Sequence, residues 1–393
     1  MRIGINCEPA GAMGGTEVSV AVLADALSSR HNVEIVHHRE GLSVDELATF
    51  SGANLAGVTS RFVPPSRPSQ YESVLPWKRL ALARSWQEEV SSPYDVFVTF
   101  RHGVPPFCHA RRGVVVCMFP TMMPVHRARR PGFTPRDISA YLYSGIEWKR
   151  RLASYSSVVA VSEFTRTWIQ ARWGVQSTMV YPPCTMNAEP VQKDPLILSV
   201  GRFSTRGHAK SQFDLAEAFS RMAVNDWSLT LAGSVGNDRG DLEYLGRVQA
   251  AASAAVNVRT NLSRDQVSQL YARASVYWHA AGFNNRAGIP DHYEHFGMTT
   301  VEAMSAGCVP LVFDAGGQPE IVEHGTSGFV WRTLDELGTL TRRLASDPAL
   351  LNRMSAAARL RARRFSHEAY VSGMTTLVEA QTETHATALE VQA

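Results

Sequence analysis

The sequence predicts an α/β protein made of two consecutive doubly wound domains, in which parallel strands alternate with helices. Three observations support this prediction. The chain has 393 residues, which is longer than chains that fold around a single hydrophobic core usually are. Short apolar runs separated by helical stretches occur in two successive series. Between the two series, residues 182–195 hold four prolines and no periodic pattern, which is typical of an interdomain linker.

The first series fills an N-terminal domain, which we place at residues 1–185. An apolar run at Ile3–Asn6 leads into a glycine-rich loop and a helical stretch from Thr16 to about Ser29. The apolar runs that follow are continuous rather than alternating and are rich in β-branched residues. Such runs are typical of strands buried on both faces of a parallel sheet. They lie at 33–38, 96–100, 113–119 and 157–162.

The second series fills a C-terminal domain at residues 196–365, after a linker at 186–195. An amphipathic stretch at 366–381 follows this domain, and residues 382–393 are expected to form a disordered tail. The apolar runs of the second series lie at 196–203, 228–235, 256–263, 276–280 and 309–317.

The composition excludes several classes of protein. A formal net charge of +3 is too small to indicate a nucleic-acid partner. The five cysteines are scattered without a CxxC pair, which fits a reducing compartment better than a disulfide framework. The N-terminus lacks the apolar core of a signal peptide, and no apolar run is long enough to span a bilayer. We therefore expect a cytoplasmic protein.

A basic stretch at 126–136 leaves a peripheral membrane contact open, through Arg127, Arg129 and Arg130. A solvated loop is the plainer interpretation of this stretch.

Candidate site residues lie just after the predicted strands, because open α/β sheets bind ligands at the carboxyl ends of their strands. Glu294 and Glu302 are separated by seven residues and flank the start of a predicted helix. The N–H groups at a helix N-terminus bind anions, and the two carboxylates can accept hydrogen bonds from sugar and ribose hydroxyls. For Glu302, a capping box with Thr299 explains the residue equally well.

Two cations, Arg202 and Lys210, follow the first strand of the second domain. The departure of a nucleoside diphosphate develops negative charge, which a guanidinium fork and an ammonium group stabilise. The alternative is a pair of solvated loop residues, of which Arg206 is an example. Because the sequence has neither an Asp-x-Asp pair nor a compact cluster of metal ligands, we expect a reaction that needs no metal ion and no other cofactor.

Glycine pairs and loop residues complete the candidate set. Gly14–Gly15 and Gly316–Gly317 each lie between a strand and a helix, where they can present amides to a phosphate or simply permit a tight turn. Neither pair has the G-x-G-x-x-G spacing of dinucleotide-binding folds, so a nicotinamide-dependent enzyme is disfavoured. Three residues of the first domain are candidates for acceptor or sugar contacts: His102, Met118 and His126. His102 follows the run at 96–100, and His126 lies in the loop after the run at 113–119.

The order of these segments resembles a known family, the retaining glycosyltransferases of family 4, which have the GT-B fold. The resemblance covers nearly the whole chain. It is carried in order by GGTE (14–17), VSEFTRTWI (161–169), VGRF (200–203) with Lys210, EHFGMTTVEAMSAGCVP (294–310) and GGQPEIVEHGTSGFVW (316–331).

This resemblance implies a fold and a role for each residue. Two Rossmann-like domains would face each other across a cleft, and the final helix would cross back to pack on the first domain. Glu294 would contact hydroxyls of the donor sugar, Glu302 would hold the ribose, and Arg202 and Lys210 would bind the diphosphate. Further donor contacts would come from Gly14, Gly15, Phe296, Gly297, Met298, Thr299, Gly316 and Gly317.

The expected activity is transfer of a hexose-type sugar from a UDP-, GDP- or dTDP-sugar to a hydroxyl of a glycan, a lipid-linked molecule or a small molecule. Since no residue stands out as a carboxylate nucleophile, we expect retention by front-face substitution. Met118 stands where the family often has a histidine that contacts the transferred sugar, which leaves the identity of that sugar and the activity itself open. The alternatives are an inactive nucleotide-sugar sensor and an epimerase or phosphorylase on the same fold.

Overall fold

The structure is a computed structural model of the chain. It describes residues 1–7, 13–65, 76–122, 147–186, 191–205, 209–222, 224, 226–285 and 287–380, with the backbone alone for residues 76–83. The chain divides into two compact units. Within the described residues, unit 1 comprises 1–161, 165–183 and the chain from 368 onward, and unit 2 comprises 162–164 and 184–367.

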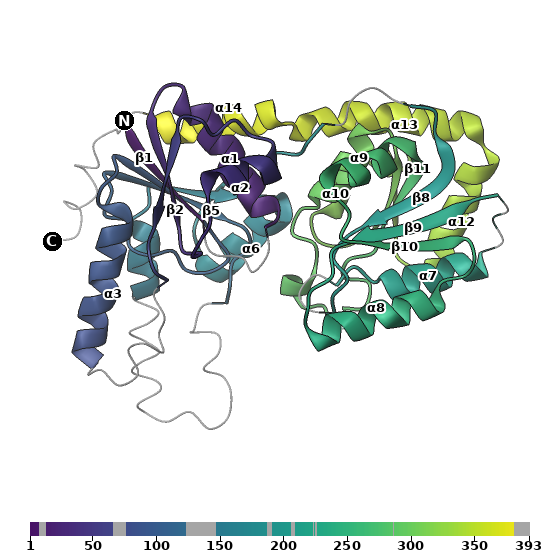
Figure 1. Ribbon diagram of the computed structural model, residues 1–393, viewed down its shortest axis with the longest axis horizontal. Coiled ribbons are helices and arrows are strands. Elements are labelled where there is room, and N and C mark those ends of the chain that lie inside the picture. Colours follow the sequence, from purple (N-terminus) through teal and green to yellow (C-terminus); the bar gives the residue numbers. More distant parts are fainter. Residues whose placement is uncertain are drawn as a thin grey trace. The chain divides into compact units, whose positions relative to one another are not determined.

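Unit 1 is built on a parallel sheet with the strand order β3-β2-β1-β4-β5-β6-β7 (Figure 1). The strands are β1 (Arg2–Cys7), β2 (Asn32–His37), β3 (Val58–Phe62), β4 (Val96–Arg101), β5 (Arg112–Cys117), β6 (Ser157–Ala160) and β7 (Thr178–Met179). Its helices are α1 (Gly15–Ser28), α2 (Val44–Ser51), α3 (Pro76–Ser91), α6 (Glu163–Trp173) and α14 (His367–Glu379).

The last helix, α14, packs on unit 1, although it follows unit 2 in the chain. The Tyr370 hydroxyl donates a 3.0 Å hydrogen bond to the carbonyl of Ser19 in α1. Near the other end of the helix, Glu379 forms ion pairs with Arg30 and His31. The helix therefore returns to the N-terminal unit, as the fold prediction expected.

Unit 2 is built on a second parallel sheet with the order β10-β9-β8-β11-β12-β13. The strands are β8 (Asp194–Val200), β9 (Ser228–Gly233), β10 (Val256–Thr260), β11 (Ala274–His279), β12 (Val309–Phe313) and β13 (Phe329–Trp331). Its α-helices are α7 (Gln212–Arg221), α8 (Arg239–Ala251), α9 (Arg264–Arg273), α10 (Met298–Ser305), α11 (Gln318–Ile321), α12 (Leu334–Ser346) and α13 (Pro348–Ala362). Short 3₁₀ turns are η2 (Pro290–His292) and η3 (Arg363–Phe365).

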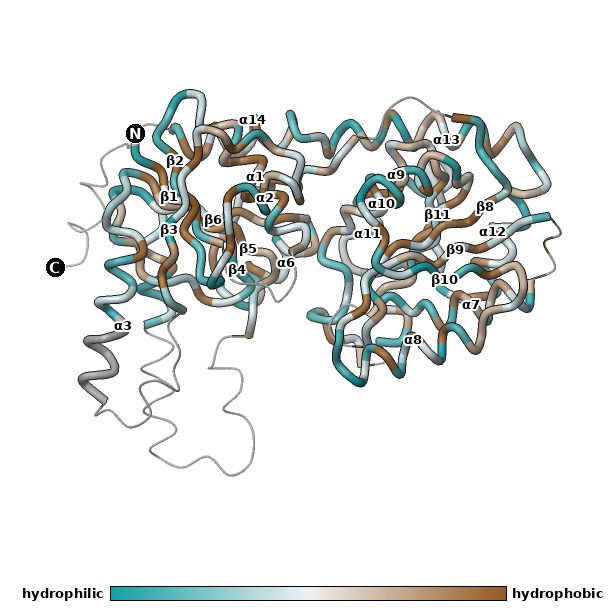
Figure 2. Tube along the Cα trace, viewed as in Figure 1, coloured by the Kyte–Doolittle hydropathy of each residue, from teal (hydrophilic) through white to brown (hydrophobic). Residues whose placement is uncertain are grey.

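The sheet of unit 2 is buried on both faces, which explains its continuous apolar strands. Val276 and Trp278 of β11 belong to a core cluster with side chains of α7, α8 and α12. Tyr277, between them, points to the other face and joins a second cluster with side chains of α9 and α10. Because successive residues of the strand are buried in cores on opposite faces of the sheet, the run Val276–Trp278 has no charged side chain. Figure 2 shows the central strand β8 as largely hydrophobic.

Several helices of unit 2 begin at side-chain caps that are visible in the sequence. Ser263 accepts a 3.2 Å hydrogen bond from the amide of Gln266, whose side chain in turn accepts one from the Ser263 amide, and this pair starts α9. Thr333 and Asp347 are the N-cap residues of α12 and α13, where their side chains accept hydrogen bonds from the amides of Glu336 and Leu350. Such caps satisfy amides that the helix itself leaves without partners.

The predicted α/β architecture with two parallel sheets is confirmed, and the differences lie at its edges. The prediction does not include the edge strands β3, β7 and β13. Strands β3 and β7 lack a continuous apolar run, and β13 is apolar but only three residues long. Strand β8 begins at Asp194, inside the predicted linker at 186–195, of which residues 187–190 lie outside the described part. The tail predicted at 382–393 also lies outside the described residues.

Candidate functional site

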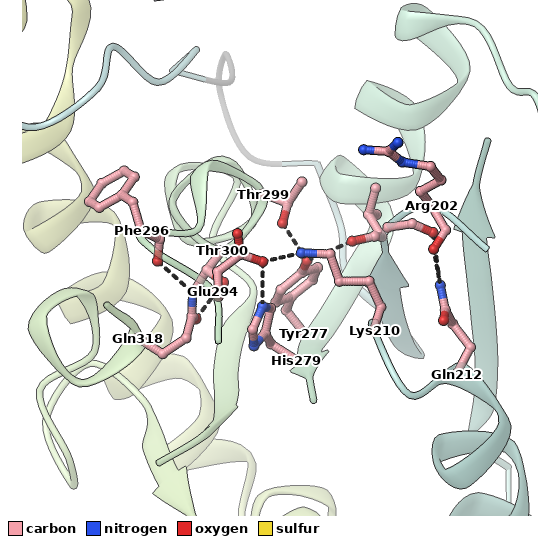
Figure 3. A network of polar contacts seen from close by, with 12 residues as sticks. Arg202, Lys210, Gln212, Tyr277, His279, Glu294, Phe296, Thr299, Thr300 and Gln318 are labelled. Atoms are coloured by element: carbon pink, nitrogen blue, oxygen red, sulfur yellow. Dashed lines mark hydrogen bonds and ion pairs between the residues drawn. The ribbon is translucent and has the colours of Figure 1, made fainter. Parts of the chain in front are cut away.

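Three neighbouring strands of unit 2 end at one edge of the sheet and carry the candidate residues. Strands β8, β11 and β12 are adjacent, and they run parallel, so their carboxyl ends meet. Gly201 and Arg202 follow β8, His279 ends β11, and Gly316 lies shortly after β12. The long segment between β11 and β12 returns Glu294 and the start of α10 to the same edge (Figure 3).

A lysine, a glutamate and a histidine meet at the centre of this edge. The Lys210 ammonium forms an ion pair with Oε2 of Glu294. His279 Nε2 lies 3.3 Å from the same oxygen, and Figure 3 shows the three side chains converging from separate stretches of the chain. Side chains of Lys210 and Glu294 are 19% and 16% exposed, so the ion pair is accessible from solvent but largely enclosed.

Glycine and glutamine hold the segment that carries the two cations. A Cβ atom at Gly201 would lie 2.6 Å from Cγ of Lys210, so the absence of a side chain makes room for the lysine stem. The Gln212 amide donates to the carbonyls of Gly201 at 2.9 Å and Arg202 at 3.1 Å. Lys210 is thereby directed to Glu294, while the Arg202 side chain stays exposed.

The glycine pair after β12 supports the backbone of Glu294. The Gly317 amide donates a 2.8 Å hydrogen bond to the Glu294 carbonyl. Gly316 has φ +64°, and a Cβ atom there would lie 2.1 Å from the same carbonyl oxygen. Only glycine fits such a close approach in the left-handed region. The pair therefore fixes the loop that carries Glu294, and a direct contact between its amides and a diphosphate stays a prediction.

Helix α10 begins at Met298, with Gly297 at the N-cap and no side-chain cap. The alternative of a capping box between Thr299 and Glu302 is therefore wrong, because Thr299 lies inside the first turn and accepts a 2.9 Å hydrogen bond from the Tyr277 hydroxyl instead. Gly297 has φ +120°, and a Cβ atom there would lie 1.9 Å from Nε2 of Gln318. The turn into α10 thus requires glycine.

Gln318 is fully buried and ties this turn to the core. Its amide donates a 2.7 Å hydrogen bond to the Phe296 carbonyl, and its carbonyl accepts one of 2.8 Å from the Thr300 hydroxyl. The ring of Phe296 is buried against Phe365, with ring centroids 5.5 Å apart. Phe296 therefore anchors the turn with its side chain, which leaves only its backbone for the predicted donor contact.

Glu302 lies in α10 as a titratable group rather than as a cap. Its carboxylate accepts a 3.2 Å hydrogen bond from the Tyr271 hydroxyl. Burial raises the pKa of Glu302 to about 7, although the hydrogen bond from Tyr271 and the charge of Arg264 act in the opposite direction. A carboxylate at this place is poised to accept hydrogen bonds from a ligand's hydroxyls, because these would favour its charged form.

The candidate residues of unit 1 lie at the carboxyl edge of its own sheet. Gly14 precedes α1, and its amide donates a 2.8 Å hydrogen bond to Oε2 of Glu17. Burial raises the pKa of Glu17. Gly15 begins α1, and His102 and Met118 directly follow β4 and β5. The contacts proposed for these residues stay predictions. His126, Arg127, Arg129 and Arg130 lie outside the described residues.

Sequence reasoning missed His279, Gln212 and Gln318. His279 lies within a predicted strand, Gln318 follows a glycine pair, and Gln212 begins α7. Each makes its hydrogen bonds to groups that only the fold brings near. The signal available was the position of His279 at the end of the apolar run 276–280, where strand-end residues face the site.

Two further observations concern the described part of the chain. No helix there is both long and apolar enough to cross a bilayer. No disulfide joins the five cysteines, all of which the structure describes.

Two family models match consecutive parts of the chain. The model for glycosyltransferase family 4 matches residues 13–185, and the model for glycosyl transferases group 1 matches residues 186–361. The chain therefore belongs to the family 4, group 1 glycosyltransferases, and it has their GT-B fold. The resemblance inferred from these segments is thus confirmed.

One relative with a known activity agrees with this assignment. A GDP-Man:Man(3)GlcNAc(2)-PP-Dol alpha-1,2-mannosyltransferase of Dictyostelium discoideum is 27% identical over 227 residues, which are 51% of this chain and 43% of that protein. The match thus spans less than half of that relative.

Solved structures match nearly the whole chain. A glycosyltransferase from Rickettsia africae has a TM-score of 0.71 at 15% identity, covering 96% of this chain and 98% of that one. The Anabaena protein HepE in complex with UDP-glucose has a TM-score of 0.67 at 16% identity, covering 96% of this chain and 100% of that one. At these identities the likeness shows the fold.

Proposed function

We propose that the chain transfers a hexose-type sugar from a UDP-, GDP- or dTDP-sugar to an acceptor hydroxyl, with retention of configuration and without a metal ion. The observation that carries this proposal is the group formed by Lys210, Glu294 and Glu302 around the start of α10. It combines a cation, an amide-rich helix start and two carboxylates within one edge of a sheet. These are the groups that recognise a diphosphate together with sugar and ribose hydroxyls.

In the proposed reaction, the bond between the anomeric carbon and the diphosphate oxygen breaks while a bond to the acceptor oxygen forms on the same face. The acceptor proton passes to the departing phosphate oxygen, so no protein base is required. Lys210 and Arg202 stabilise the charge that develops on the diphosphate, which is the role otherwise given to a divalent cation. Glu294 binds hydroxyls of the sugar and Glu302 binds hydroxyls of the ribose, so that the diphosphate between them lies beside these cations.

The first experiment is a thermal-shift panel with UDP, GDP, dTDP, ADP, their common sugars and NAD, each with and without EDTA. A ligand at 100 times its Kd stabilises the folded state by about 2.7 kcal/mol. We expect a shift with one nucleotide family, unaffected by EDTA. No shift with any nucleotide, or a shift with NAD alone, would contradict the proposed function, and loss of the shift in EDTA would contradict metal independence.

Two variants connect the shift to the site. Glu302→Gln should weaken nucleotide binding, because the amide replaces one of the two carboxylate oxygens that accept hydrogen bonds. Glu323→Gln is the matched control, since Glu323 is exposed and lies outside the group at the start of α10. Once the donor is known, the anomeric configuration of the product is read by proton NMR, and an inverted product would rule out front-face substitution.

A further inference from the structure

His279 occupies a place that the roles above do not use. It is the last residue of β11, between β8 and β12, and it is 2% exposed. Its Nε2 atom lies 3.3 Å from Oε2 of Glu294. A carboxylate oxygen can only accept a hydrogen bond, so the contact requires Nε2 to carry the proton. The imidazole thus reaches from the interior of the sheet to the candidate sugar-binding carboxylate (Figure 3).

The Glu294 oxygen that His279 contacts is also the one held by Lys210. The two partners differ in freedom of movement. Lys210 extends from a loop on a flexible four-carbon stem, whereas His279 belongs to a buried strand. A diphosphate that recruits the Lys210 ammonium competes with Glu294 for it, because both are anions. The contact from His279 does not depend on this cation and helps the carboxylate to keep its orientation.

The backbone of Glu294 is already fixed by the Gly317 amide and by the close approach of Gly316. What is left to determine is the direction of its side chain. A buried donor on a central strand is suited to this task, because the sheet leaves it few alternative positions.

We propose that His279 is a positioning residue, which keeps the Glu294 carboxylate aimed at the donor sugar while Lys210 engages the diphosphate. This inference rests on the proposed function. It separates two parts of donor recognition: His279 acts on the sugar through Glu294, and it takes no part in holding the nucleotide. The two parts can be measured separately with a nucleoside diphosphate and the corresponding nucleotide sugar.

The experiment compares the wild-type chain with His279→Leu and His279→Gln by isothermal titration calorimetry. The probes are UDP with UDP-glucose, GDP with GDP-mannose, and dTDP with dTDP-glucose. For each base, the ratio of the Kd of the diphosphate to the Kd of its sugar isolates the contribution of the sugar. We expect His279→Leu to lower this ratio by about 10-fold or more while the Kd of the diphosphate stays unchanged. His279→Gln, whose amide N–H reaches a similar position, should retain most of the ratio.

Ser275→Ala is the matched control for the loss of a buried hydrogen bond in the same strand. Ser275 lies at the opposite end of β11, where its hydroxyl donates to the Asp194 carbonyl. We expect this variant to lose stability and to keep the wild-type ratio. If His279→Leu weakens both ligands of a pair by the same factor, or if Ser275→Ala lowers the ratio equally, His279 is a structural residue and the inference is overturned.

Should His279→Leu fail to fold, His279→Asn and His279→Gln decide the matter. The shorter Asn amide cannot reach Glu294, so His279→Asn should lower the ratio of the two Kd values, whereas His279→Gln should keep it near that of the wild type. Equal ratios in the two variants would overturn the inference. A wild-type chain that binds none of the six probes would instead contradict the proposed choice of donor, and the inference would fall with it.

Discussion

Replacing Glu302 by glutamine should change how the stability of unit 2 depends on pH. Burial raises the pKa of Glu302 from 4.5 to about 7, so the folded chain binds this proton more tightly than the unfolded chain does. The stability contributed by the protonated group is fully present below pH 4.5 and is lost as the pH rises through about 7. At about 1.4 kcal/mol per pH unit, the total loss reaches about 3 kcal/mol. Glutamine stays neutral throughout and avoids this loss.

The assay is differential scanning calorimetry of the wild type, Glu302→Gln and the exposed control Glu323→Gln between pH 4.5 and pH 8. A change of 1 kcal/mol moves the midpoint of a domain of this size by about 2–4 °C. Relative to the wild type, Glu302→Gln should therefore gain about 6–12 °C from the lowest to the highest pH, and Glu323→Gln should gain nothing. Other titrating groups cancel in the difference. A difference between Glu302→Gln and the wild type that stays constant over this range would refute the reasoning.

Three further variants test the site from other sides. Lys210→Met should lower turnover about 100-fold or more because it removes the ammonium that stabilises the leaving diphosphate; initial rates should be unchanged in the exposed control Lys149→Met, and an equal loss in both would contradict this role. Gly316→Ala should abolish nucleotide-sugar binding and lower the melting temperature, because the new Cβ atom would lie 2.1 Å from the carbonyl oxygen of Glu294. The control is Gly325→Ala, at φ +79° with open space around it, which should lower the free energy of unfolding by only about 1–2 kcal/mol and leave binding intact. Tyr271→Phe removes the hydroxyl that favours the carboxylate form of Glu302, so the loss of stability with rising pH should extend to higher pH in the calorimetric series. If the pH at the middle of this loss is unchanged, the hydrogen bond from Tyr271 does not set the pKa of Glu302.

The central strands could be predicted from the sequence because their physical requirement is local. In a run such as Val276–Trp278, successive side chains are buried in cores on opposite faces of the sheet, so large non-charged residues follow one another without alternation. The edge strands differ. Strand β3 has one neighbouring strand and is partly exposed, so it tolerates polar residues, whereas β7 and β13 are too short, at two and three residues, to form a recognisable run. The glutamate pair and the glycine pairs were also visible, since their residue types and order are features of the chain itself.

The partners of those residues are decided by the tertiary structure alone. Lys210 and Glu294 are 84 residues apart in the sequence, and no local pattern indicates that their side chains meet. The Gly317 amide could be assigned to the Glu294 carbonyl only once β12 lay beside the loop before α10.

The pKa of Glu302 is a property of the fold for the same reason, because desolvation is produced by the elements packed around α10 rather than by the neighbours of the residue in sequence. The sequence by itself determined which groups are present at the strand ends and in what order. Folding determined that Lys210 and His279 contact the same carboxylate oxygen of Glu294, because hydrogen bonds and ion pairs depend on distances in space that the linear order of residues does not contain.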